Sequence, residues 1–137
     1  MEHFFATCPR GLEDQLAGEL TAAGATHTQV VAGGVGFAGD WEACYRANLW
    51  SRIATRILWR VAHGPYKREE DIYRLAHDVP WHERFAVRRT LRVYMTAIRC
   101  PLKSIDFITL RIKDAVCDRF RAEIGERPSV DTAEPNV

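Results

Sequence analysis

The sequence of 137 residues has no long apolar run and no cysteine pair at zinc-ligand spacing. No stretch approaches the roughly 18 apolar residues that a membrane-spanning helix requires. The N-terminus has no basic patch before an apolar segment, which argues against a secretion signal. The four cysteines are scattered and the five histidines form no HxH or HExxH pattern. We therefore expect reduced thiols, a cytoplasmic protein, no membrane partner and no metal site.

Catalytic signatures are missing as well. The sequence contains no Walker loop, no Gly-x-Ser-x-Gly and no Asn-Pro-Pro-aromatic segment. Residues 34–39 match the GxGxxG pattern, but dinucleotide-binding proteins also need an acidic residue about 20 positions later to hold the ribose. Residues 43–66 contain no Asp or Glu. We assign these glycines to a hairpin turn and the loop after it, and we expect no catalytic residue and no cofactor in this chain.

Acidic residues are also absent from Arg84 to Lys103, a segment with six Lys and Arg. The whole chain has a net charge of +1, yet residues 51–103 carry twelve basic and five acidic side chains. Residues 1–50 and residues 104–137 both carry a net negative charge. Such a local excess of positive charge favours an anionic partner, and we interpret that partner as a nucleic-acid backbone.

The hydrophobic pattern of the first half predicts an α+β fold. Alternation predicts strands, Leu12, Leu16 and Leu20 indicate an amphipathic helix, and Asp40 is a suitable N-cap. The predicted elements are a strand at 3–7, a helix through Leu12–Leu20, strands at 28–31 and 35–38 joined by a Gly33-Gly34 turn, a helix at 41–50 and a strand at 52–62. The order β-α-β-β-α-β is that of a ferredoxin-like unit.

The second half predicts a further, incomplete α/β unit. We expect a helix at 69–77, a strand at 91–98, a helix at 104–123 and the entry to another strand at 127–131. The long helix has a broad apolar stripe and a second, narrower one on the opposite side. The broad stripe comprises Ile105, Ile108, Ile112, Ala115, Val116 and Phe120, and the narrow one comprises Phe107, Leu110 and Cys117.

The candidate phosphate-binding residues lie in and after the acid-free segment. Loop residues before a strand can reach phosphates, and a helix N-terminus with a hydroxyl and an ammonium group suits an anion. We predict contacts from Arg88, Arg89, Arg99, Lys103, Ser104 and Lys113. A separate row of exposed arginines, Arg52, Arg56 and Arg60, is explained equally well by a phosphate track or by protection of an edge strand against aggregation.

Several segments resemble a known family. These are Phe4-Phe5-Ala6-Thr7-Cys8-Pro9-Arg10-Gly11-Leu12-Glu13, Gly33-Gly34-Val35, Tyr45–Arg52, Leu110–Phe120 and Arg127-Pro128-Ser129-Val130-Asp131. In this order they are similar to the start of bacterial large-subunit (23S) ribosomal RNA guanine-N2 methyltransferases. The resemblance implies a ferredoxin-like domain at 1–67 and an RNA-binding THUMP domain at 68–137, truncated at its C-terminus.

The same resemblance implies the partners. They would be structured RNA, above all 23S rRNA, and a downstream methyltransferase domain of the same polypeptide that binds S-adenosylmethionine. The sequence is also compatible with two alternatives. One is the THUMP module of a tRNA-modifying enzyme, and the other is a ferredoxin-like module that docks on a protein through Trp41, Trp50, Trp59 and Trp81.

Overall fold

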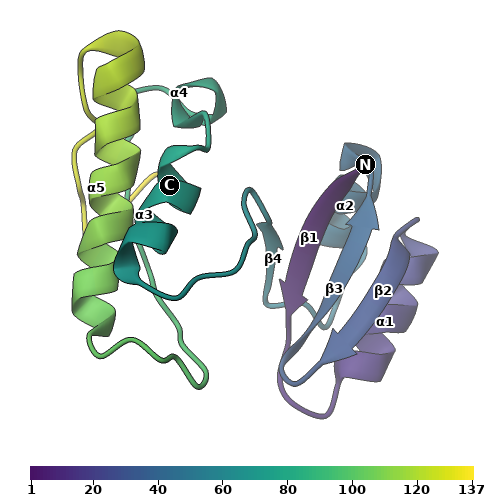
Figure 1. The fold of residues 1–137 in the computed structure, drawn as a ribbon. Helices are drawn as coiled ribbons and strands as arrows, with labels where there is room; N and C mark the ends of the chain where they lie inside the picture. The colour runs from purple at the N-terminus through teal and green to yellow at the C-terminus, as the bar shows by residue number, and fades with distance from the viewer. The chain divides into compact units, whose positions relative to one another are not determined.

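The computed structural model describes all 137 residues, which form two compact units, Met1–Val61 and Ala62–Val137 (Figure 1). None of the helices combines the length and the apolar character needed to cross a membrane.

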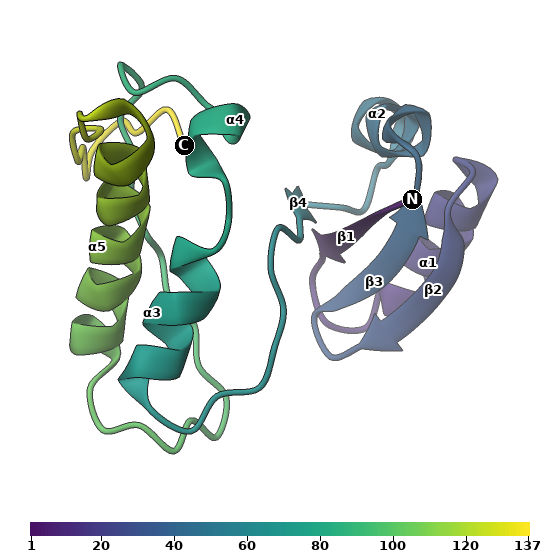
Figure 2. The same cartoon turned by 45° about the horizontal axis from the view of Figure 1, so that its top comes forward.

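The first unit is a four-stranded sheet with two helices on one face. Its elements are β1 (Glu2–Thr7), α1 (Glu13–Ala22), β2 (Thr26–Val31), β3 (Gly34–Gly39), α2 (Trp41–Trp50) and β4 (Arg56–Trp59). The strand order is β2-β3-β1-β4 and every neighbouring pair is antiparallel. Both helices lie on the same side of the sheet (Figure 2). This arrangement confirms the predicted ferredoxin-like fold.

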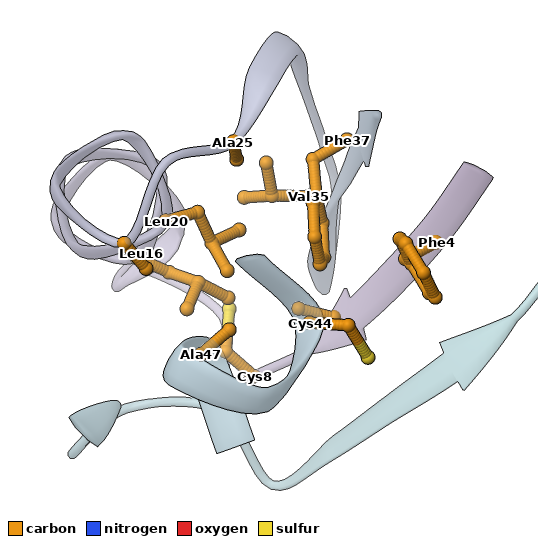
Figure 3. Packing of buried hydrophobic residues seen from close by; sticks show 11 residues of the cluster. Phe4, Cys8, Leu16, Leu20, Ala25, Val35, Phe37, Cys44 and Ala47 are labelled. Carbon is orange, nitrogen blue, oxygen red and sulfur yellow. The ribbon is translucent and has the colours of Figure 1, made fainter. Parts of the chain in front are cut away.

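The core of the first unit lies between the sheet and the two helices (Figure 3). Because side chains alternate along a strand, every second residue of β1 and β3 faces the helices. The buried strand residues are Phe4, Ala6, Val35 and Phe37, and they pack against Leu16, Leu20, Cys44 and Ala47. The rings of Phe4 and Phe37 stack with centroids 5.2 Å apart.

Side-chain caps fix the loops of this unit. Asp40 is the N-cap of α2, as predicted, since Ala43 N donates to Asp40 Oδ1 at 2.8 Å. The carboxylate of Glu13 accepts hydrogen bonds from Gly33 N at 3.0 Å and Gly11 N at 2.8 Å. These backbone donors, led by that of Gly33, hold the pKa of Glu13 below its usual value. Glu13 thereby joins the start of α1 to the β2–β3 turn.

The β2–β3 turn and the last strand differ most from the prediction. The β2–β3 turn consists of Ala32 and Gly33, with Gly33 at φ +85°, whereas Gly34 is the first residue of β3. The last strand covers only Arg56–Trp59 and not 52–62. Its start is delayed because the preceding backbone is bound by side chains: Arg52 N donates to Glu19 Oε1 at 3.2 Å and Ala54 N donates to Ser51 Oγ at 3.0 Å.

The second unit is built around a long helix. Its helices are α3 (Glu69–His77), α4 (Trp81–Arg84) and α5 (Ile105–Ile124). The predictions of α3 and α5 are confirmed, and α5 begins after Ser104, whose Oγ accepts from Phe107 N at 3.2 Å. The short α4 has no counterpart among the predicted elements.

A polar network joins α3 to α5. The Tyr73 hydroxyl donates to Asp118 Oδ2 at 2.5 Å, and the Arg111 guanidinium lies 4.1 Å from the centre of the Tyr73 ring. Arg111 also forms an ion pair with Glu70 at 3.0 Å. The hydrogen bond to Asp118 raises the pKa of Tyr73 to about 12, because the carboxylate stabilises the protonated phenol. The network fixes the register of the two helices.

The apolar stripes of α5 are buried only in part. Val116 and Phe120 are buried against Leu91, with Trp81 and Phe85 packed around them. The expectation for Ile105 is wrong, since its side chain is 44% exposed. This cluster lies toward the C-terminal half of the helix, and Ile105 lies in the first turn. In the narrow stripe only Cys117 is buried, whereas Phe107 and Leu110 are exposed.

The predicted strand at 91–98 is absent. Its only pairing is a single parallel bridge between Leu91 and Val130, with Leu91 N donating to Ser129 O at 3.0 Å. The predicted strand entry at 127–131 is reduced to the same bridge. A strand requires a hydrogen-bonded neighbour along its length, and residues 93–98 have none in this structure.

Candidate nucleic-acid interface

The six predicted phosphate-binding residues lie on the second unit in two groups and not in one cluster. Arg88 and Arg89 come just before Leu91, which packs on Phe120 near the C-terminal end of α5. Arg99, Lys103 and Ser104 come just before its N-terminal end. Between Ser104 and Phe120 the helix rises about 24 Å. The candidate surface is therefore elongated along α5, with Lys113 between the two groups.

The group before α5 presents donors at a helix N-terminus. Ser104 caps the helix, and its side chain and that of Lys103 are exposed. The first N–H groups of a helix carry a partial positive charge. Arg99 has a left-handed backbone at φ +52° in the loop that leads into the helix. Arg99 and Lys103 thus place two positive charges where the chain enters α5, next to the single carboxylate of Asp106 in its first turn.

Four of the predicted cations are available to bind an external anion. Arg88, Arg89, Arg99 and Lys103 are exposed and form no ion pair. By contrast, the cations further along α5 are neutralised locally: Arg119 pairs with Glu123 at 3.1 Å and Arg121 pairs with Asp118 at 3.6 Å. Four of the six cations in the acid-free segment therefore remain without a carboxylate partner in the structure.

Lys113 differs from these four. It is partly buried and forms an ion pair with Asp114 at 2.6 Å. It lines a cavity of about 410 Å³ together with Arg92, Val93, Leu110 and three other residues. Arg92 was not among the predicted site residues, although it belongs to the same acid-free segment. Its guanidinium lies 4.2 Å from the centre of the Tyr94 ring and donates to the Thr132 carbonyl.

No cluster suited to a metal ion or a dinucleotide is present. The structure holds no group of three His, Cys, Asp or Glu side chains that could bind a metal. The GxGxxG segment forms strand β3 along its whole length, so its backbone N–H groups belong to the sheet and not to a phosphate-binding loop. The glycines therefore serve the strand itself, and not the turn and loop that the sequence suggested.

The four tryptophans do not form one surface within a unit. Trp41 and Trp59 pack edge to face at 5.0 Å in the first unit, where Trp50 is exposed. Trp81 belongs to the second unit, where it packs against the Phe120 cluster and donates through Nε1 to Ala76 O at 2.7 Å.

Comparison with known families agrees with this architecture. The family model of the THUMP domain matches residues 66–137, and that of the RlmL ferredoxin-like domain matches residues 3–58. The chain belongs to the THUMP domain family. The THUMP match covers the second unit, which carries the unpaired cations described above.

The relatives of this THUMP chain are much longer. It is 39% identical over 137 residues to the ribosomal RNA large subunit methyltransferase K/L of Aeromonas salmonicida (strain A449), covering 100% of this chain and 19% of that protein. The protein of the same name from Syntrophotalea carbinolica is 40% identical over 134 residues, which are 98% of this chain and 19% of the relative.

A solved structure has the same fold. SMU.472, described as a methyltransferase and crystallised with SAH, superimposes with a TM-score of 0.79 over 98% of this chain and 34% of that one. The sequence identity is 24%, so this likeness supports the fold.

Proposed function

We propose that this chain is the RNA-recognition part of an S-adenosylmethionine-dependent 23S rRNA guanine-N2 methyltransferase. It would hold structured rRNA by phosphate and shape contacts and present a guanine to a catalytic domain of the same polypeptide. The observation that carries the proposal is the set of exposed, unpaired cations on the THUMP unit. The names of the relatives point to rRNA as the partner.

The proposal assigns cofactor binding and RNA binding to different domains. S-adenosylmethionine would bind in the catalytic domain, outside this chain, and the whole enzyme would act in the cytoplasm, where ribosomes are assembled. The ferredoxin-like domain would comprise residues 1–67 and the THUMP domain residues 68–137. Among the candidate residues, Arg88, Arg89, Arg99 and Lys103 would contact phosphates, with Ser104 at the helix N-terminus, while Lys113 would first have to leave Asp114.

The salt dependence of RNA binding tests the site. The double variant Arg99→Gln, Lys103→Gln should lower the magnitude of the slope of log K against log salt by about 1.5, because each lost phosphate contact removes about 0.7–0.9 from that slope. The measurement is fluorescence anisotropy with a labelled rRNA stem-loop between about 50 and 200 mM salt.

A charge-matched control separates specific contacts from net charge. The double variant Arg46→Gln, Arg121→Gln also removes two positive charges, but both arginines are already paired, with Glu42 and Asp118. Its slope should stay close to that of the wild type. An unchanged slope in the Arg99/Lys103 variant, or an equal change in the control, contradicts the site. Tighter binding to tRNA than to the rRNA stem-loop would instead favour a tRNA-modifying enzyme.

A further inference from the structure

The ferredoxin-like sheet has one face that neither helix of its own unit covers. In Figure 1 both helices lie behind the sheet, which turns its other face toward the reader. The alternation that buries Phe4 and Ala6 sends His3, Phe5 and Thr7 to this open face. The strand register places Leu58 beside Phe5 and Arg56 beside Thr7, and Arg60 N donates to His3 O at 2.9 Å.

Phe5 forms a flat platform at the centre of this face. Its register partner on β3 is Gly36, and Gly34 is the partner of Thr7. A Cβ atom placed on Gly34 would lie 2.6 Å from Phe5 Cζ, so the ring occupies the space that a side chain there would fill. The ring therefore rests on the glycine backbone of β3 and is only partly covered, and its neighbour Leu58 is 47% exposed.

The charge of the open face has one sign. Arg56 and Arg60 are exposed and form no ion pair, and His3 lies beside Arg60. The only carboxylate in the four strands is Glu2, which alternates with His3 and accepts from Trp59 Nε1 at 2.9 Å. If these arginines only protected the edge strand against aggregation, acidic residues could serve equally well, because charges of either sign prevent strand pairing. The absence of carboxylates from the open face favours an anionic ligand.

A hollow adjoins the platform. It has a volume of about 240 Å³ and is lined by His3, His27, Gln29, Gly36 and Arg60, together with Phe4 and Phe37. A Cβ atom on Gly36 would have no neighbour closer than 3.9 Å, so the floor of the hollow is open at this residue. The imidazole, amide and guanidinium groups at its rim can all donate hydrogen bonds.

We propose that this open face binds an unpaired RNA segment, with one base stacked on Phe5 and the flanking phosphates held by Arg56 and Arg60. Every base has a π-face that stacks on an aromatic ring, and RNA-binding proteins commonly display such rings on a four-stranded sheet. The inference rests on the proposed function and extends RNA binding from the THUMP unit to the ferredoxin-like unit.

The test uses the 137-residue chain and a labelled single-stranded RNA decamer that cannot pair with itself. Phe5→Leu keeps an apolar side chain but removes the ring, so affinity should fall about tenfold. The matched control is Tyr45→Leu on α2, which removes an aromatic ring that is 66% exposed on the helix side of the sheet. This control should bind like the wild type.

A second variant distinguishes a loss of RNA binding from a loss of folding. Gly36→Val places a side chain in the hollow, where the Cβ atom has space and a β-branched residue suits a strand. Thermal unfolding followed by circular dichroism should show an intact fold, while affinity for the decamer should fall about tenfold because the base is excluded. The double variant Arg56→Gln, Arg60→Gln should lower the salt slope by about 1.4, and Arg46→Gln, Arg121→Gln should not.

Photo-cross-linking with 5-bromouridine in the decamer supplies a direct readout. The expected cross-link lies in the tryptic peptide that ends at Arg10 and contains Phe5.

Wild-type affinity in a folded Gly36→Val variant, or an effect of Tyr45→Leu equal to that of Phe5→Leu, overturns the inference. If only Arg99→Gln, Lys103→Gln weakens binding, the proposed function stands and the open face is excluded. If only the open-face variants weaken binding, with the rRNA stem-loop as well as with the decamer, the phosphate contacts assigned to Arg99 and Lys103 are wrong and the open face stands. Absence of RNA binding altogether overturns both.

Discussion

Phe120→Ala is expected to lower the free energy of unfolding of the second unit by about 3–5 kcal/mol, the usual cost of removing a buried phenylalanine ring. The Phe120 side chain is 0% exposed and is the largest fully buried side chain of the unit. It contacts Leu91 and Val116, and its ring centre lies 5.1 Å from that of Phe85. Because this cluster joins α5 to the segment after α4, its loss should release the loop that carries Arg88 and Arg89.

The matched control is Phe107→Ala on the same helix. Phe107 is 48% exposed and lies outside the cluster, so its replacement should change stability by no more than about 1 kcal/mol. Urea unfolding measured by circular dichroism gives the two free energies, and hydrogen exchange of peptides from α3 and α5 assigns the loss to the second unit. Equal effects of the two variants would contradict the burial that the structure gives to α5.

The ends of α5 could be predicted because the signals are local. Ser104 precedes the apolar pattern and caps the helix, and Gly125, at φ +78°, ends it in the left-handed conformation that glycine adopts readily. The ferredoxin-like order was predictable for a similar reason, since alternation and the Asp40 cap operate within a few residues. These features depend little on distant parts of the chain.

The predictions that were wrong concern features that depend on residues far away in the sequence. Alternation from Leu91 to Ile98 is compatible with a strand, but it does not supply the partner that a strand needs, and the structure pairs only Leu91. Burial of Ile105 would likewise require a neighbouring element at the first turn of α5. A periodic pattern shows which side chains share a face, and it does not show which part of that face is covered.

Prediction of the candidate site from the sequence was limited in the same way, because pairing of its side chains depends on the fold. Composition was sufficient to name the acid-free segment and four cations that the structure leaves unpaired. It did not reveal that Lys113 is paired with Asp114, or that Arg92 stacks on Tyr94. The Phe5 platform depends on the register of β1 against β3, which brings a ring and two glycines together across the sheet.

The second large effect is expected where β1 packs against Gly34. Gly34→Ala should lower the free energy of unfolding of the first unit by about 3 kcal/mol, near the upper end of the usual cost of overpacking. The added Cβ atom would lie 2.5 Å from the Ala6 carbonyl oxygen and 2.6 Å from Phe5 Cζ. The ring can turn away, but Ala6 lies on β1, which pairs with β3 on one side and β4 on the other. Relief of the clash therefore requires a shift of the central strand.

Gly36→Ala provides the control on the same strand and the same face. Its Cβ atom would lie 3.9 Å from Gln29 O and 4.0 Å from Phe5 Cδ2, which are ordinary contacts. Removing a glycine from a strand should stabilise the unit by about 0.5–1 kcal/mol. Urea unfolding of both variants, followed by circular dichroism, decides the comparison. If Gly34→Ala proves as stable as Gly36→Ala, then β1 does not approach Gly34 as closely as the structure shows, and the packing of Phe5 on the β3 backbone, which depends on that approach, is contradicted.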